Sequence, residues 1–164
     1  MAVSLTDCEE FDQLISRHFA FLETRGFAVH EARRVDAEMH DAGVAKRYES
    51  PDLRLDIGWS AFEQSLSILL KFDRPQLPGQ LRRAYFEPLV EFLSDGVDAP
   101  IVPQVRHRMD ETELMRLMEQ RSFIFESGLE PVAARLAEKL DGQLREIRSL
   151  ADERILAYHD WIAN

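Results

Sequence analysis

Cysteine is nearly absent from this sequence of 164 residues, in which Cys8 is the only one. A single cysteine cannot form an internal disulfide or a zinc site of the CxxC type, and this usage favours a reducing, cytoplasmic compartment. Long apolar runs are also lacking, since no stretch reaches the roughly 20 residues of a membrane span. The first ten residues do not place a basic region before an apolar stretch, so we expect no signal peptide and no membrane partner.

Basic residues are outnumbered, because 20 lysines and arginines face 30 aspartates and glutamates and give a formal net charge of −10 at pH 7. Nucleic-acid binding needs basic side chains that replace the counterions of the backbone, so this charge argues against a nucleic-acid partner. An acidic surface favours basic protein partners and accelerates encounter with them. Hydrophobic residues still make up 45% of the chain, which is enough for a folded core at this length.

Motifs of common enzyme classes are missing as well. The sequence contains no GxGxxG, GxxxxGK[ST], HExxH or GxSxG pattern, each of which supplies a backbone geometry or a ligand set for catalysis. We therefore expect no enzymatic activity, no cofactor and no metal. One alternative stays open, namely a small metal-dependent hydrolase that uses His30, His40 and nearby carboxylates.

The first regular element is indicated by a capping-box pattern, with Thr6 as the N-cap and Glu9 three residues later. Apolar residues then recur at helical spacing as far as Leu22. Gly26 is placed to end this helix as the first residue beyond the C-cap. The pattern predicts a helix over about residues 7–25.

Strand periodicity follows in the middle of the chain. Apolar and polar side chains alternate over residues 53–59 and again over residues 66–72, which is typical of half-buried antiparallel strands. With an earlier strand over about residues 44–48, they predict a three-stranded antiparallel meander, to which residues 27–30 add a fourth strand. Residues 31–43 show no clear period, so a loop and a short helix both stay open there.

The sheet is expected to end where prolines and a glycine crowd residues 74–79. Apolar spacing then predicts a helix over about residues 81–93, kinked or divided at Pro88. Residues 94–103 are rich in turn-forming residues and are the best candidate for a linker. We therefore expect an α+β core domain over residues 1–95.

The remaining residues, 104–164, are expected to form a long helical hairpin. Asp110 can cap its first helix, which Gly128 ends. Apolar residues from Leu129 to Ile162 step by three and four, as in one straight helix. We expect this hairpin to pack on the core domain or on a second copy of the chain.

Acidic side chains cluster around the predicted first hairpin of the sheet. Those within the strand should stand on the face opposite the apolar residues, where they can meet a basic partner. The alternative is that they only keep a sheet edge soluble. The candidate partner-binding residues are Asp36, Glu38, Asp41, Glu49, Asp52, Arg54 and Asp56.

The order of these features resembles that of small, uncharacterised bacterial proteins in which an FLxxxGF helix end precedes a YES hairpin strand. Here the two patterns occupy residues 21–27 and 47–57, and the resemblance covers about residues 7–73. Some proteins of this kind look like immunity proteins, which neutralise the toxins of competing cells. The resemblance implies a scaffold and a protein-binding role, and it implies no catalytic residue.

Together these features predict an α+β fold, with an N-terminal helix, an antiparallel sheet of three or four strands, and C-terminal helices. We expect a cytoplasmic protein-binding module, most concretely an immunity-type inhibitor whose acidic surface occludes a basic partner such as a toxin. Besides the hydrolase, a second alternative is a structural homodimer joined through the C-terminal helices.

Overall fold

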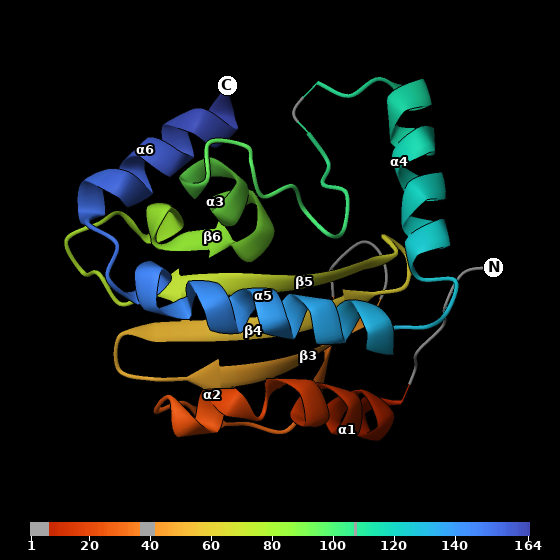
Figure 1. Cartoon of the computed structure of the whole chain (residues 1–164), viewed down its shortest axis with the longest axis horizontal. Helices are drawn as coiled ribbons and strands as arrows, with labels where there is room; N and C mark the ends of the chain where they lie inside the picture. The colour runs from red at the N-terminus through yellow and green to blue at the C-terminus, as the bar shows by residue number, and fades with distance from the viewer. Residues whose placement is uncertain (1–6, 37–41, 107) are drawn as a thin grey trace.

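The computed structural model describes residues 7–36, 42–106 and 108–164, and Figure 1 shows its course from the N-terminal helix to the C-terminal one. The fold is α+β, as predicted, with a helix first, an antiparallel sheet next and helices last. The elements are α1 (Cys8–Phe19), α2 (Phe21–Thr24), β1 (Ala28–Val29), β2 (Arg33–Asp36), β3 (Ala42–Glu49), β4 (Leu53–Ser60), β5 (Ser65–Phe72), η1 (Gly79–Arg82), β6 (Arg83–Tyr85), α3 (Phe86–Leu93), α4 (Glu111–Ile124), α5 (Glu130–Arg148) and α6 (Asp152–Ala163).

The sheet runs in the order β1-β3-β4-β5-β6, with β2 also paired to β3, and every pairing is antiparallel. The four predicted strands are present as β1, β3, β4 and β5. Local periodicity identified β3, β4 and β5, whereas β1 has only two residues. The strand count was wrong, because the described residues form a sheet of six strands. The two additional strands, β2 and β6, lie at the edges of the sheet.

These edge strands carry little periodicity of their own. The residues of β2 are Arg33-Arg34-Val35-Asp36, and they pair with β3 from Ala45 to Ala42. The three residues of β6 fall within the helix predicted over residues 81–93, where the chain instead forms η1, β6 and α3. Pro88 stands in the first turn of α3, where its missing N–H is tolerated.

One face of the sheet carries the core. Its side chains alternate along β4 and β5 with less buried ones on the other face. Figure 1 shows α5 lying across this face and α1 beside β3, while α3 and α6 gather near β6. The residues of α5 that face inward, such as Leu136 and Ile147, belong to the same hydrophobic cluster as the strands, so α5 packs on the sheet.

The ends of the first helix differ slightly from the expected ones. The N-cap is Asp7, not Thr6, because the Asp7 side chain accepts the hydrogen bond of the Glu9 backbone amide. Ala20 separates α1 from the short α2. Gly26 follows with a φ of +89°, as expected for the residue that ends a helix.

The long helix predicted over residues 129–162 is divided in two, so that prediction was wrong. The helix α5 ends at Arg148, and the Ser149 hydroxyl donates to the carbonyl oxygens of Arg145 and Glu146. The turn buries Leu150 and redirects α6 toward α3. Burial of apolar side chains against the sheet and against α3 therefore outweighs the continuous helical spacing. Among the helices of the described residues, none has both the length and the apolar character that crossing a membrane requires.

Candidate functional site

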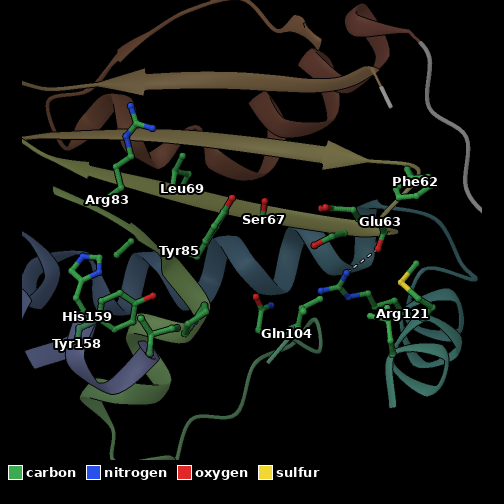
Figure 2. Close-up of a pocket in the computed structure, with 17 residues that line it drawn as sticks. Phe62, Glu63, Ser67, Leu69, Arg83, Tyr85, Gln104, Arg121, Tyr158 and His159 are labelled. Atoms are coloured by element: carbon green, nitrogen blue, oxygen red, sulfur yellow. Dashed lines mark hydrogen bonds between the residues drawn. The ribbon is translucent and has the colours of Figure 1, made fainter. Parts of the chain in front are cut away.

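The sheet face opposite α5 is open, and Figure 2 views it with α5 behind the strands. Its side chains are small or half-buried along β4 and β5, as at Gly58, Ser67 and Leu69. Over β2 to β5 this face forms a hollow of about 420 Å³. A sheet face that helices leave uncovered in this way is available for a partner or a ligand.

A larger cleft of about 940 Å³ continues from this hollow, between the open face of β5 and β6, the helix α4 and the helix α6. Aromatic and aliphatic side chains form most of its walls, and a few polar groups lie among them, as in many ligand sites. Figure 2 shows the walls contributed by the strands and helices. The apolar lining residues are Phe62, Leu69, Ala84, Tyr85, Pro88, Val105, Leu114, Met118, Tyr158 and Ile162.

Arg121 holds one wall of this cleft in place. Its side chain is buried, with 4% of the residue exposed. Nε donates to the Pro103 carbonyl at 2.8 Å and Nη1 donates to the Glu63 carbonyl at 2.9 Å. Burial lowers the pKa of the Arg121 guanidinium. Because these bonds join α4 to the turn after β4 and to the loop before α4, Arg121 fixes the width of the cleft at this end.

The opposite wall is formed by α6. The Nε2 atom of His159 lies 3.0 Å from the Leu81 carbonyl oxygen, which fits a ring that donates its Nε2 proton. Burial raises the pKa of the neighbouring Tyr158 to about 12. The contact of His159 with Leu81 therefore holds α6 in place as the wall of the cleft. Tyr158 stays a neutral hydrogen-bonding group at physiological pH.

The helix α4 exposes most of its surface. Leu117 and Arg121 are its buried residues. Met115 is 60% exposed and Phe123 is 76% exposed, and Phe62 at the mouth of the cleft is 62% exposed. The sequence did not lead us to expect this exposed apolar surface on α4. The one signal for it is that the apolar residues of α4 do not fall on a single helical stripe, so they cannot all face the core.

The described members of the predicted partner-binding set are spread along the sheet and its first hairpin. Asp36 ends β2 opposite Ala42, whereas Glu49 ends β3 seven residues later, about 23 Å away at roughly 3.3 Å per residue. Glu38 and Asp41 lie outside the described residues. Among the seven, the sheet register brings Glu49 opposite Arg54.

The acidic members near the hairpin are engaged by cations of the same chain. Asp56 accepts from Arg47 Nε at 2.8 Å and lies 3.5 Å from Arg54 Nε. Asp52 lies in the turn before β4 and accepts from Arg148 Nη2 at 2.8 Å. That these seven residues form one partner-binding surface stays a prediction, although these ion pairs weaken the field that they offer to a partner.

The residues suggested for a metal site are only partly described. The Nε2 atom of His30 lies 3.3 Å from Glu49 Oε2, and both side chains are about half exposed. His40 lies outside the described residues. Within the described part of the chain, no group of three or more histidine, cysteine, aspartate or glutamate side chains is arranged to hold a metal ion.

No family model matches this sequence, and neither the curated proteins nor the solved structures contain a chain that is significantly similar to it.

Proposed function

We propose that this chain is a protein-binding module that receives a basic protein on the exposed face of α4. The observation that carries the proposal is the composition of that face. A helix of 14 residues that buries only Leu117 and Arg121 presents Met115 and Phe123 to solvent. Exposed apolar side chains gathered on one element are typical of interaction sites, and methionine adapts well to irregular partner surfaces.

The charge of α4 supports a basic partner. Its exposed charged residues are three glutamates and one arginine, Arg116, which gives a local charge of −2. Glu111 and Glu119 border a hollow of about 640 Å³ lined by Leu114, Met115 and Met118. Within the described part of the chain, neither glutamate has an ion pair of its own, so both are available to basic side chains. The net charge of −10 acts in the same direction at longer range.

An immunity-type inhibitor is one specific form of this function. Such a protein acts by covering the active surface of a toxin, which requires a docking surface and no catalytic residue. An apolar centre bordered by acidic side chains suits that task, since the apolar contacts give affinity and the charges accelerate association. If the partner is a toxin, addition of this chain should abolish its activity.

A photo-crosslinking experiment tests the proposal. A photoreactive amino acid replaces Met115 in one variant and the exposed loop residue Val97 in a control, and the crosslinked protein is identified by mass spectrometry. That protein is then purified and its binding to the full chain is measured by calorimetry at increasing salt. We expect crosslinking at residue 115 only, binding that weakens with salt, and a loss of about tenfold or more in affinity for Phe123→Ser.

Three outcomes would contradict the proposal. Equal crosslinking from both positions would show that α4 is not a specific surface. Binding that is unchanged in Phe123→Ser and in Glu119→Lys would place the partner elsewhere. Crosslinks only between copies of this chain, together with a dimeric mass in solution, would favour the structural homodimer.

A further inference from the structure

Three basic side chains lie side by side across the open sheet face. Arg54 of β4 is directly opposite Lys71 of β5, and Lys71 is directly opposite Arg83 of β6. Directly opposite residues in an antiparallel sheet point to the same face, and neighbouring strands lie about 4.8 Å apart. Arg54, Lys71 and Arg83, here termed the cationic row, therefore occupy about 10 Å of this face.

The cationic row is unexpected in a chain of net charge −10. Like charges directly opposite one another destabilise a sheet. Acids balance one end of the row, because Glu49 is directly opposite Arg54 and Asp56 Oδ2 lies 3.5 Å from Arg54 Nε. Within the described part of the chain, Lys71 and Arg83 have neither an ion pair nor a side-chain hydrogen bond. The excess positive charge of the row therefore lies at Lys71 and Arg83.

A buried donor in the row points to a missing acceptor. The Nε atom of Arg54 is buried and makes no hydrogen bond among the described residues. It lies 3.5 Å from Asp56 Oδ2, as an ion pair without hydrogen-bond geometry. Folded proteins contain few buried donors without an acceptor. Because this Nε has no accessible surface, an anion at the row can accept from it only when the Arg54 side chain turns toward the solvent.

The surroundings of the row have the size and shape of a ligand site. Arg54 and Lys71 line a hollow of about 550 Å³ together with Arg82, and the acids Glu49 and Asp73 also line it. Arg83 lines the neighbouring cleft of about 940 Å³. Arg82 donates Nε and Nη2 to the carbonyl oxygens of Leu77 and Pro75, and has no carboxylate partner in the described part of the chain.

An apolar platform lies beside the row. Leu69 is directly opposite Tyr85 in the adjacent row of the same face, and Tyr85 is 50% exposed. Figure 2 shows Arg83, Leu69 and Tyr85 near one another at one end of the cleft. A charged row next to an aromatic ring suits a ligand that has an anionic end and a flat apolar body.

We propose that the cationic row binds the phosphate group of a small organic phosphate whose aromatic body lies on Leu69 and Tyr85. A phosphate group carries a charge of about −1.5 to −2 and three strong acceptor oxygens, so it can accept from several members of the row at once. Arginine donates to phosphate in a bidentate manner and lysine adds a point charge. The row lies on β4, β5 and β6 and not on α4, although α4 lines the same cleft as Leu69 and Tyr85. The proposal does not depend on the proposed protein partner.

The experiment uses the full chain with AMP, inorganic phosphate and adenosine as probes, and measures binding by calorimetry and by NMR chemical shifts. We expect AMP to bind more tightly than inorganic phosphate and adenosine not to bind. Lys71→Gln and Arg83→Gln should each lower the affinity for AMP by about tenfold, since each removes one charge-assisted contact. Arg135→Gln, which removes an exposed arginine of α5, is the matched control and should leave AMP binding unchanged.

The proposal is overturned if AMP does not bind, or if Lys71→Gln and Arg83→Gln bind it as tightly as the parent chain. Equal affinities for AMP and inorganic phosphate would also overturn it, because Leu69 and Tyr85 would then contribute nothing. Circular dichroism of each variant excludes loss of the fold as the cause. Phe123→Ser on α4 should still bind AMP, so this test and that of the protein partner can fail independently.

Discussion

Lys46 is buried on the core face of β3, where its ammonium group lies 3.1 Å from both carboxylate oxygens of Asp12 on α1. The Lys46 ammonium also donates to the His30 carbonyl at 3.0 Å. Burial opposes ionisation of Asp12, but hydrogen bonds from the Ala32 amide and from Lys46 outweigh it and lower the pKa of this carboxyl. This ion pair joins the first helix, the segment before β2 and the centre of the sheet.

Removal of one partner of this pair should cost more than removal of both. Asp12→Ala leaves the charged ammonium group of Lys46, which is only 2% exposed, without its partner. We expect the free energy of unfolding to fall by about 3–5 kcal/mol. The double variant Asp12→Ala/Lys46→Met removes the buried charge and should be more stable than Asp12→Ala alone. Urea unfolding followed by circular dichroism measures these differences. Additive losses in the double variant would show that the two side chains are not coupled.

The Asp52–Arg148 pair should make stability depend on acid pH. The hydrogen bond from Arg148 is the main cause that lowers the pKa of Asp52 from 3.8 to about 2. The ionised form is favoured in the folded state, so its contribution is complete above about pH 4 and is lost as the pH falls toward 2. Because Asp52 is half exposed, the contribution should be at most about 1 kcal/mol.

Asp52→Asn should remove this part of the pH dependence. Thermal unfolding between pH 2 and pH 6 gives the comparison, with Asp98→Asn in an exposed loop as the control. A parent and an Asp52→Asn variant whose melting temperatures fall in parallel below pH 4 would be inconsistent with the proposed role of Arg148.

Two glycines of the open face should respond differently to alanine. A Cβ at Gly43 would lie 2.9 Å from the Trp59 carbonyl oxygen, so the two strands would have to separate. We expect Gly43→Ala to cost about 1–3 kcal/mol. A Cβ at Gly58 would meet the Val44 carbonyl at an ordinary 3.6 Å, and Gly58→Ala should change stability by less than about 0.5 kcal/mol. Denaturant unfolding of the two variants tests this contrast, and equal losses would contradict it.

Glu87 should hold the predicted linker against the body of the protein. Its buried carboxylate accepts from the Ile101 amide at 2.6 Å and from the Val102 amide at 3.0 Å. Lys139 lies 3.3 Å away as its ion-pair partner. Glu87→Gln should cost about 1–3 kcal/mol, because an amide offers only one acceptor oxygen to two backbone donors.

Limited proteolysis measures the release of this loop. We expect faster cleavage within residues 94–103 in Glu87→Gln than in the parent chain. Glu91→Gln is the control, since the Glu91 side chain pairs with the exposed Arg106 and its backbone bonds to the loop are kept in the variant. Cleavage at the parent rate would mean that the buried apolar residue Val102 is sufficient to anchor the loop.

The sequence by itself determined the elements whose signals are local. The strands β3, β4 and β5 follow from alternation, and the ends of helices follow from Gly26, Asp110 and Gly128. These signals reside in neighbouring residues and do not require the rest of the fold. Alternation over residues 53–59 also puts Trp59 on the apolar side of β4, and Trp59 is buried there.

Only the tertiary structure brings together the residues of the candidate sites. Arg54, Lys71 and Arg83 are far apart in the chain, and each appears in isolation as an ordinary polar position until the strand register aligns them. The turn between α5 and α6 and the short strands β2 and β6 likewise depend on what packs or pairs with them. Short segments contain too few residues for a period, and pairing between distant segments is set by the burial of the whole core, so no local pattern can specify either.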